Sequence, residues 1–127
     1  IIREYGMEDQ AVLISLKYDL ITYAESVYPE MQTSYLIWAS FGNTAALTCD
    51  YLGMEEETAT SPTIEAVHEQ GKQALVWTAN EEKSQRHFLC SDIDGLITDN
   101  VAQATGLIKE LESRSDLQRI IDRFLGI

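Results

Sequence analysis

Five short apolar runs alternate along the chain with segments of helical periodicity. The runs cover residues 11–16, 33–37, 48–54, 73–77 and 93–97. Short apolar runs separated by helical patterns are typical of βαβ units, so the pattern predicts a parallel α/β sheet. No internal repeat beyond this alternation and no low-complexity tract interrupts the pattern. One partial domain over residues 1–127 is therefore sufficient to explain it.

Helix boundary signals stand between the later runs. Ser61 is the predicted cap of a helix with Pro62 in its first turn, and Gly71 is its predicted end. Asn80 is a good cap for the next helix, although a ligand-facing role for its side chain is an equal alternative. Apolar residues then recur at helical spacing after Asn100, at Val101, Ala104, Ile108 and Leu111.

The last helix signal is a capping-box pattern formed by Ser115 and Gln118. It leads into four apolar residues at helical spacing, Leu117, Ile120, Ile121 and Phe124. This arrangement predicts that the chain ends as a helix docked on the body of the domain.

Polar residues follow the last two apolar runs directly, as Thr-Ala-Asn at 78–80 and Thr-Asp-Asn at 98–100. In a β/α barrel the active-site groups lie at the C-terminal ends of the strands. Segments 76–80 and 94–100 resemble the last two strands of the glycerophosphodiester phosphodiesterase family, with its Trp-Thr-Val-Asn and Gly-Ile-Ile-Thr-Asp signatures. Ala79 replaces the usual Val, and Val101 stands where the family commonly has Pro.

The resemblance extends over the whole chain. Residues 12–16 resemble the family's strand that ends in Ser-Phe, and residues 49–55 resemble its strand with an Asp and an aromatic residue. Segment 41–57 is most similar to the membrane-anchored members from Gram-positive bacteria. The resemblance implies a partial TIM-type (β/α) barrel of about the last five strand-helix units. Because such a barrel needs about 250 residues, we expect this 127-residue chain to be the C-terminal piece of a larger protein.

Members of this family hydrolyse glycerophosphodiesters to an alcohol and glycerol 3-phosphate. They use two histidines as acid and base and a divalent metal, Ca²⁺ or Mg²⁺, held by carboxylates. The His-Arg-Gly, Glu-x-Asp and His-Asp contexts that supply these groups are absent from this sequence. His68 and His87 lie in helical patterns and are interpreted as structural residues. We therefore expect neither a catalytic residue nor a metal ligand in this chain.

Five residues near the predicted strand ends are candidates for substrate binding: Trp77, Ser15, Lys17, Glu55 and Asn80. The indole of Trp77 could pack against a glycerol moiety and donate one hydrogen bond, or fill the barrel core. Lys17 could meet a phosphate as a point charge. Glu55 could touch the metal or a hydroxyl, or only solubilise its loop. Thr98 and Asp99 are better explained as a turn that starts the last part of the chain.

The formal charge of −12 argues against nucleic acid as a partner, because phosphate backbones require clustered Lys and Arg. It also disfavours binding to an anionic membrane surface. No apolar run of about 18 residues is present, so we expect this segment to be soluble, with any anchor in another part of the parent. Cys49 and Cys90 adjoin apolar runs and are expected to be free buried thiols.

Two functions from different classes are consistent with these features. The leading hypothesis is the C-terminal part of a metal-dependent phosphodiesterase that acts on a glycerophosphodiester; the alternative is a non-catalytic truncated-barrel module for binding or assembly. A barrel of the phospholipase D-like toxin type fits the two strand-end motifs less well. In each case five strands leave open edges and an inner apolar face, for which Leu13, Leu36, Leu75 and Ile97 are candidates, so we expect self-association.

Overall fold

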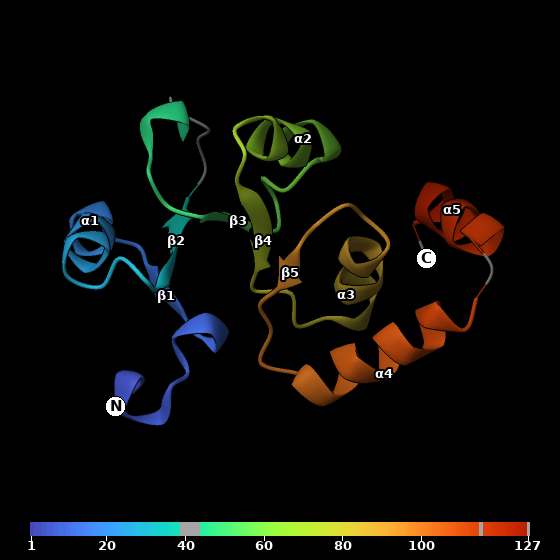
Figure 1. Ribbon diagram of the computed structural model, residues 1–127. Coiled ribbons are helices and arrows are strands. Elements are labelled where there is room, and N and C mark those ends of the chain that lie inside the picture. Colours follow the sequence, from blue (N-terminus) through green and yellow to red (C-terminus); the bar gives the residue numbers. More distant parts are fainter. Residues whose placement is uncertain (39–43, 115, 127) are drawn as a thin grey trace.

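The computed structural model describes residues 1–38, 44–114 and 116–126. Figure 1 shows the strands side by side in chain order with helices around them. The elements in order are η1 (Arg3–Tyr5), η2 (Glu8–Gln10), β1 (Val12–Ser15), α1 (Tyr18–Val27), β2 (Gln32–Ile37), η3 (Thr44–Ala46), β3 (Tyr51–Glu55), α2 (Ser61–Glu69), β4 (Gln73–Trp77), α3 (Glu82–Leu89), β5 (Gly95–Leu96), α4 (Val101–Glu112) and α5 (Asp116–Leu125).

The strands form one parallel sheet in the order β1-β2-β3-β4-β5. Each strand pairs only with its neighbours in sequence, which is the connectivity of a (β/α) barrel. The predicted partial TIM-type barrel is therefore confirmed. All five predicted runs contain a strand, although β3 begins three residues later than its run and β5 is only two residues long.

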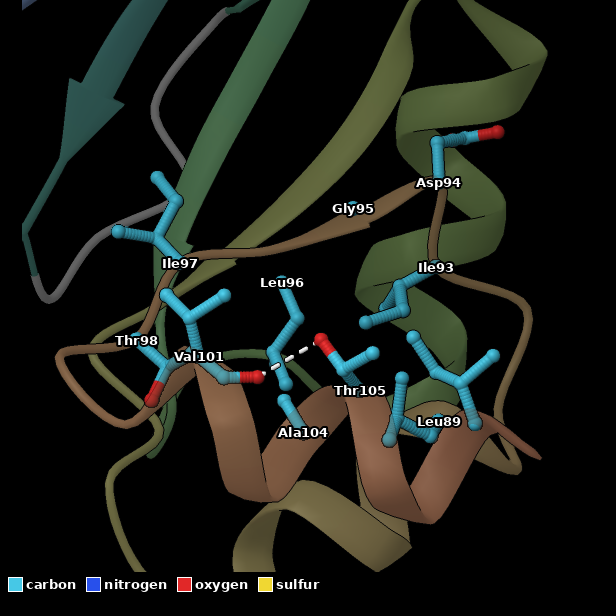
Figure 2. A pocket seen from close by; sticks show the side chains of 11 residues that line it. Leu89, Ile93, Asp94, Gly95, Leu96, Ile97, Thr98, Val101, Ala104 and Thr105 are labelled. Atoms are coloured by element: carbon cyan, nitrogen blue, oxygen red, sulfur yellow. Dashed lines mark hydrogen bonds between the residues drawn. The ribbon is translucent and has the colours of Figure 1, made fainter. Parts of the chain in front are cut away.

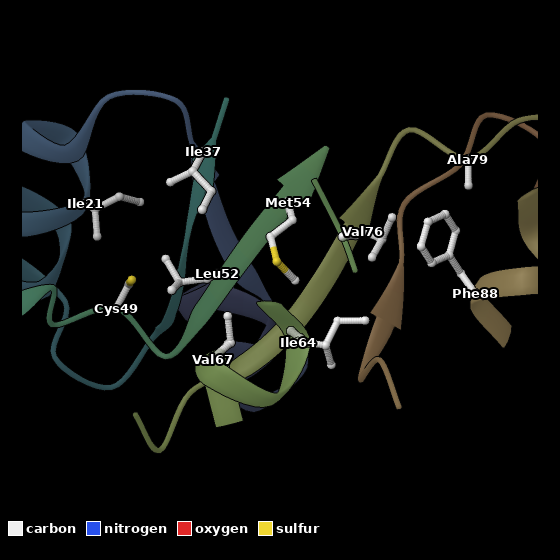
Figure 3. Close-up of a cluster of buried hydrophobic side chains, with 12 residues drawn as sticks. Ile21, Ile37, Cys49, Leu52, Met54, Ile64, Val67, Val76, Ala79 and Phe88 are labelled. Atoms are coloured by element: carbon white, nitrogen blue, oxygen red, sulfur yellow. The ribbon is translucent and has the colours of Figure 1, made fainter. Parts of the chain in front are cut away.

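The hydrophobic core lies between the sheet and helices α1, α2 and α3 (Figure 3). Leu52 and Met54 of β3 and Val76 of β4 are fully buried on this face. The predicted stripe of α2, Ile64 and Val67, packs against them, and Ile21 of α1 and Phe88 of α3 complete the cluster. Burial of such side chains stabilises the fold by about 1.5–3 kcal/mol each, so this face holds the half-barrel together.

The register of the strands determines which residues lie on the opposite, inner face of the sheet. Leu36 of β2 pairs with Gly53, and Gly53 pairs with Leu75 of β4, so Leu36 and Leu75 lie on this face as predicted. The prediction for Leu13 is wrong, because Leu13 pairs with the helix-facing Thr33 and packs against the helix-side core. Ile14 takes the inner position instead and leaves 44% of its surface exposed.

Two predicted helix caps are displaced by one residue. The cap of α2 is Thr60, whose backbone N–H donates to the Oγ1 of Thr63 at 2.8 Å in a capping box, while Ser61 is the first helical residue. The cap of α3 is Glu81 rather than Asn80, whose side chain is used elsewhere. The predicted end of α2 is confirmed, because Gly71 has φ +73°, a left-handed conformation in which glycine carries no steric penalty.

The chain ends in a helix as predicted, but the four apolar residues of that helix do not pack on the domain. The apolar side chains of α5, among them Leu117, Ile120 and Phe124, are exposed, while Asp122 on its other side is 2% exposed and pairs with Arg114. The polar side of the helix therefore faces the body of the domain. Ser115 of the predicted capping box lies outside the described residues, as do residues 41–43 of the segment most similar to membrane-anchored members.

An ion-pair network joins the last three helices. Arg86 of α3 donates to Glu110 of α4 at 2.8 Å, and Arg114 donates to the same carboxylate at 2.6 Å. The hydrogen bond from Arg86 is the main cause that holds the pKa of Glu110 below its ordinary value.

Among the helices in the described ranges, none combines the length and the hydropathy needed to cross a bilayer.

The network predicts a loss of stability in acid. Because the pKa of Glu110 is lower in the folded state, its contribution is complete above the ordinary glutamate value, about 4.3, and is lost as the pH falls through the lowered pKa. Glu110→Gln should flatten this part of the dependence of unfolding free energy on pH. Urea unfolding across the acid range measures it, with Glu112→Gln on the same helix as the control. Equal acid slopes for the wild type and Glu110→Gln would contradict the prediction.

Candidate functional site

Four residues form a row across the inner face at the C-terminal ends of β2 to β5. Glu55 pairs directly with Trp77. Trp38 follows the pair Ile37–Met54, and Ile97 follows the pair Val76–Leu96, so both extend the same register row. We call Trp38, Glu55, Trp77 and Ile97 the mouth row. It occupies the end of the sheet where a β/α barrel carries its chemistry.

Trp77 lies over the inner face and meets a second indole. Its ring and that of Trp38 are in edge-to-face contact, with centroids 5.4 Å apart and planes at 72°. A Cβ built on Gly53 would lie 3.4 Å from Cδ1 of Trp77 and would overlap the side chain of Leu36. The absence of a side chain at Gly53 thus makes room for both. The Nε1–H of Trp77 is buried and has no hydrogen-bond acceptor among the described residues.

Glu55 is half-buried beside Trp77. Its backbone carbonyl accepts from Thr58 and Ala59, but within the described ranges its carboxylate has neither a hydrogen bond nor an ion pair. The next carboxylate along the chain differs, because Glu56 accepts a hydrogen bond from the hydroxyl of Ser84. Of these two acidic groups, Glu55 is the one that can interact with a ligand.

Asn80 cross-links the loops that follow β4 and β5. Its Oδ1 accepts from the Thr98 hydroxyl at 3.1 Å and from the Asp99 backbone at 2.8 Å, and its Nδ2 donates to the Asp99 carboxylate at 2.8 Å. Fully buried Gln85 donates to Thr98 at 2.9 Å, and Thr98 also accepts from the Asn100 backbone. The two strand-end motifs thus form one polar network, and the predicted turn at Thr98 is confirmed.

The network predicts a large effect for loss of one hydroxyl. Thr98→Val removes a donor to Asn80 and an acceptor for Gln85. The variant should lower the free energy of unfolding by about 1–3 kcal/mol, because buried Gln85 keeps its bond to the Ala79 carbonyl but loses the one to Thr98. Thr105→Val is the matched control, since among the described residues the exposed Thr105 hydroxyl bonds only to the Val101 carbonyl of its own helix. Urea unfolding measures both; equal values would show that the network carries no stability.

Ser15 and Lys17 lie at the end of β1, two strands away from Glu55. Ser15 pairs with the helix-facing Tyr35, and its hydroxyl accepts the backbone N–H of Lys17 at 3.0 Å, which shapes the turn into α1. The Lys17 side chain is exposed. The structure therefore brings Trp77 and Glu55 together and leaves Ser15 and Lys17 at the far edge of the sheet.

The two histidines lie on outer helices, as the sequence predicts. His68 on α2 pairs with Asp94 at 2.8 Å, and the same carboxylate accepts the backbone N–H of Ala74 at the N-terminal end of β4. His87 on α3 is exposed and packs against Phe88. Within the part of the chain that the structure describes, no group of three His, Cys, Asp or Glu side chains is placed to hold a metal ion.

Cys49 is buried and Cys90 half-buried, both as free thiols, and burial raises the pKa of each.

A pocket of about 530 Å³ lies between β5 and α4 and includes Ile97 of the mouth row in its lining (Figure 2). Its walls are mainly apolar, with Leu89, Ile93 and Leu96 on one side and Val101 and Ile108 on the other. Asp94, the acidic residue of its lining, is already bonded to His68 and Ala74. The pocket flanks the unpaired edge of β5, which points to packing rather than to chemistry.

Comparison with known proteins identifies the family. The model of the glycerophosphoryl diester phosphodiesterase family matches residues 7–103. The chain therefore belongs to this family. No significant match was found among curated proteins.

Solved structures of similar fold agree with this assignment. A glycerophosphoryl diester phosphodiesterase from Silicibacter pomeroyi DSS-3 has a TM-score of 0.77 and 21% identity over 87% of this chain and 42% of its own. An Oleispira antarctica phosphodiesterase in complex with sn-glycerol-3-phosphate has a TM-score of 0.70 and 18% identity, and the match covers 77% of this chain and 41% of its own. The Agrobacterium tumefaciens glycerophosphodiester phosphodiesterase has a TM-score of 0.68 and 16% identity, and the match covers 85% of this chain and 48% of its own. This chain thus spans less than half the length of each.

Sequence reasoning missed one member of the mouth row, Trp38. A signal was present, because Trp38 stands two residues after Leu36 and therefore continues the inner face of an extended strand. The adjacency of Glu55 and Trp77 also needed the register between β3 and β4, which depends on long-range pairing.

Proposed function

We propose that this chain is the C-terminal portion of a metal-dependent glycerophosphodiester phosphodiesterase. The parent would hydrolyse glycerophosphodiesters to an alcohol and glycerol 3-phosphate, as part of lipid metabolism. The observation that carries the proposal is the match of the family over residues 7–103 together with a half-barrel that keeps its strand-end motifs in one network.

In this proposal the chain supplies one wall of the substrate pocket. Trp77 packs against the glycerol moiety and donates its free Nε1–H, and Glu55 beside it interacts with a polar group of the substrate. Asn80 and Ser15 line the rim, and Lys17 attracts the phosphate as a point charge. Asn80 retains one amide hydrogen for a ligand after its bond to Asp99.

The described residues do not fit a metal site, because they assemble no suitable group of ligands. The acid, the base and the carboxylates for Ca²⁺ or Mg²⁺ would therefore come from chain outside this sequence. The product complex of the Oleispira relative, with sn-glycerol-3-phosphate, supports a substrate of this class for the parent.

The complete open reading frame provides the test. If it encodes His-Arg-Gly and Glu-x-Asp segments, the purified parent should release glycerol 3-phosphate from glycerophosphodiesters when a divalent metal is present. Trp77→Ala should then lower kcat/KM while the protein stays folded by circular dichroism. A reading frame without these segments, or a parent with them that shows no turnover, would favour the non-catalytic binding or assembly module. Hydrophobic helices upstream would show that the parent is anchored in a bacterial membrane, as we also propose.

Self-association of the isolated chain is a further part of the proposal. The sheet has open edges at β1 and β5, the pocket beside β5 is apolar, and the apolar side of α5 is exposed. Water contact with such surfaces costs about 25 cal/mol for each Å², so copies should pair through them. Light scattering should give a mass above that of one chain, and Ile120→Glu on α5 should lower it. A monomeric wild-type chain at micromolar concentration would contradict self-association.

A further inference from the structure

Helix α5 presents an apolar face to solvent. Figure 1 shows this helix at the outer edge of the half-barrel, away from the strands. Its large apolar side chains fall within an arc of about 140° in a helix of about 3.6 residues per turn. All of them are at least 40% exposed: Leu117, Ile120, Ile121, Phe124 and Leu125. On the opposite side, buried Asp122 ties the helix to the body through Arg114. The apolar face is therefore held outward, where a partner can cover it.

Two opposite charges stand on one flank of this face. Asp116, in the first turn, has a side chain that is 97% exposed, and its Oδ1 lies 3.9 Å from Nη1 of Arg119. Arg123, in the last turn, has its Nη2 3.5 Å from Oδ2 of Asp92 and still has N–H donors to offer. Seven residues are nearly two helical turns, so Asp116 and Arg123 lie on the same side of the helix, one near its start and the other near its end.

This charge pattern is self-complementary in one orientation only. In an antiparallel pair of α5 helices the same flanks face each other, so Asp116 of one copy lies opposite Arg123 of the second copy, twice about the two-fold axis. A parallel pair would instead oppose Asp116 to Asp116 and Arg123 to Arg123. The antiparallel arrangement also sets Leu117 opposite Phe124 and brings the two Ile120 side chains together near the axis. Charge and shape thus favour the same pairing.

We propose that α5 is the interface of a two-fold dimer of this chain, in which the apolar faces meet antiparallel and two Asp116–Arg123 pairs fix the orientation. The inference rests on the proposed self-association and deepens it, because it selects one surface and one geometry. A two-fold contact uses the same patch on both copies and is closed. Pairing of the β1 edge with the β5 edge is heterologous and can add further copies. The α5 contact therefore stops at two chains and does not involve the mouth row.

The size of the contact determines the affinity to be expected. A helix of ten residues is about 15 Å long, so the interface belongs to the small class that supports weak association. The dissociation constant of the dimer should be about 10 to 100 μM. Sedimentation equilibrium across the micromolar range should show an average mass that rises with concentration and levels off at two chains.

Charge reversal tests the orientation. Asp116→Arg or Arg123→Glu alone sets like charges opposite each other, and each should raise the dissociation constant by at least about fivefold. The double variant restores two opposite pairs and should return the dissociation constant to within about twofold of the wild type. This rescue cannot come from within one chain, because Arg123→Glu still opposes Asp92. Asp19→Arg in the first turn of α1 and Lys109→Glu in the last turn of α4 make the same charge changes elsewhere and should have no effect.

Single cysteines report on the same geometry. The background is Cys90→Ser, because Cys90 and Ile120 line one pocket. Ile120→Cys, near the two-fold axis, should give disulfide-linked dimers on mild oxidation. Phe124→Cys alone should not, because its two copies lie about 10 Å apart along the axis. A mixture of Phe124→Cys and Leu117→Cys chains should give mixed dimers. Circular dichroism checks that every variant is folded.

Several results would overturn the α5 dimer. They are a monomer at all concentrations, a mass that continues to rise beyond two chains, self-linked dimers of Phe124→Cys, and a double charge variant as weak as the single ones. Adsorption of a monomeric chain to phosphatidylcholine vesicles through α5 would also overturn it and would assign the apolar face to a lipid surface. Because these assays need neither metal nor substrate, their outcome is independent of whether the parent hydrolyses diesters.

Discussion

Purified alone, the 127-residue chain is expected to release no glycerol 3-phosphate from glycerophosphodiesters above the rate in buffer, with either Ca²⁺ or Mg²⁺ present. Its two histidines lie on outer helices, and the described residues assemble no metal site. Enzymes accelerate such reactions by at least about 10⁶-fold. We expect the isolated chain to provide none of this acceleration. An assay of released glycerol 3-phosphate measures it, with the complete parent as the positive control.

Turnover that depends on added metal and follows the chain through purification would contradict this expectation. It would show that residues of this half-barrel supply an acid and a base that we have interpreted as structural. Substitution of His68 and His87 by Gln would then identify which histidine is responsible.

Leu52→Ala is expected to have the largest effect on folding. Leu52 is fully buried at the centre of the sheet, where β3 meets both β2 and β4. Such a truncation costs about 2–5 kcal/mol, a large part of the 5–15 kcal/mol that stabilises an ordinary domain. The variant should be mostly unfolded in moderate urea, as measured by circular dichroism.

Leu20→Ala on α1 is the matched control, because the same side chain is removed from a site that is 49% exposed. Its cost should stay below about 1 kcal/mol. If both variants lost equal stability, the helix-side cluster would not be the main source of stability of the half-barrel.

The order of elements could be predicted from the sequence because each run of the sheet is buried by local neighbours. Four of the five runs are four to six residues long as strands, and the fifth, at Gly95–Leu96, was located correctly although it pairs over two residues. Successive side chains of a strand alternate between two faces, and this alternation alone does not show which set of side chains faces the helices. Leu13 and Ile14 are both apolar, and only the pairing of β1 with β2 decides that Leu13 packs outward.

The site was predictable in its position but not in its contacts. Trp77 and Asn80 are candidates because Trp77 ends an apolar run and Asn80 follows it. The bonds of Asn80 to Thr98 and Asp99 join residues 18 and 19 positions apart, so local helix-cap statistics gave the wrong role. The outward apolar side of α5 was missed for a related reason: periodicity shows that a helix has two faces, but not which of them meets the body.

The strictly sequential strand order has a consequence for synthesis of the protein. Since every strand pairs only with the one made just before and just after it, each strand-helix unit can join the sheet as it leaves the ribosome. No strand must wait for a partner encoded far downstream, and loop-closure entropy stays low at each step. A pause in translation between two units would leave a shorter sheet with the same pairings, so growth from β1 toward β5 should proceed by addition rather than rearrangement.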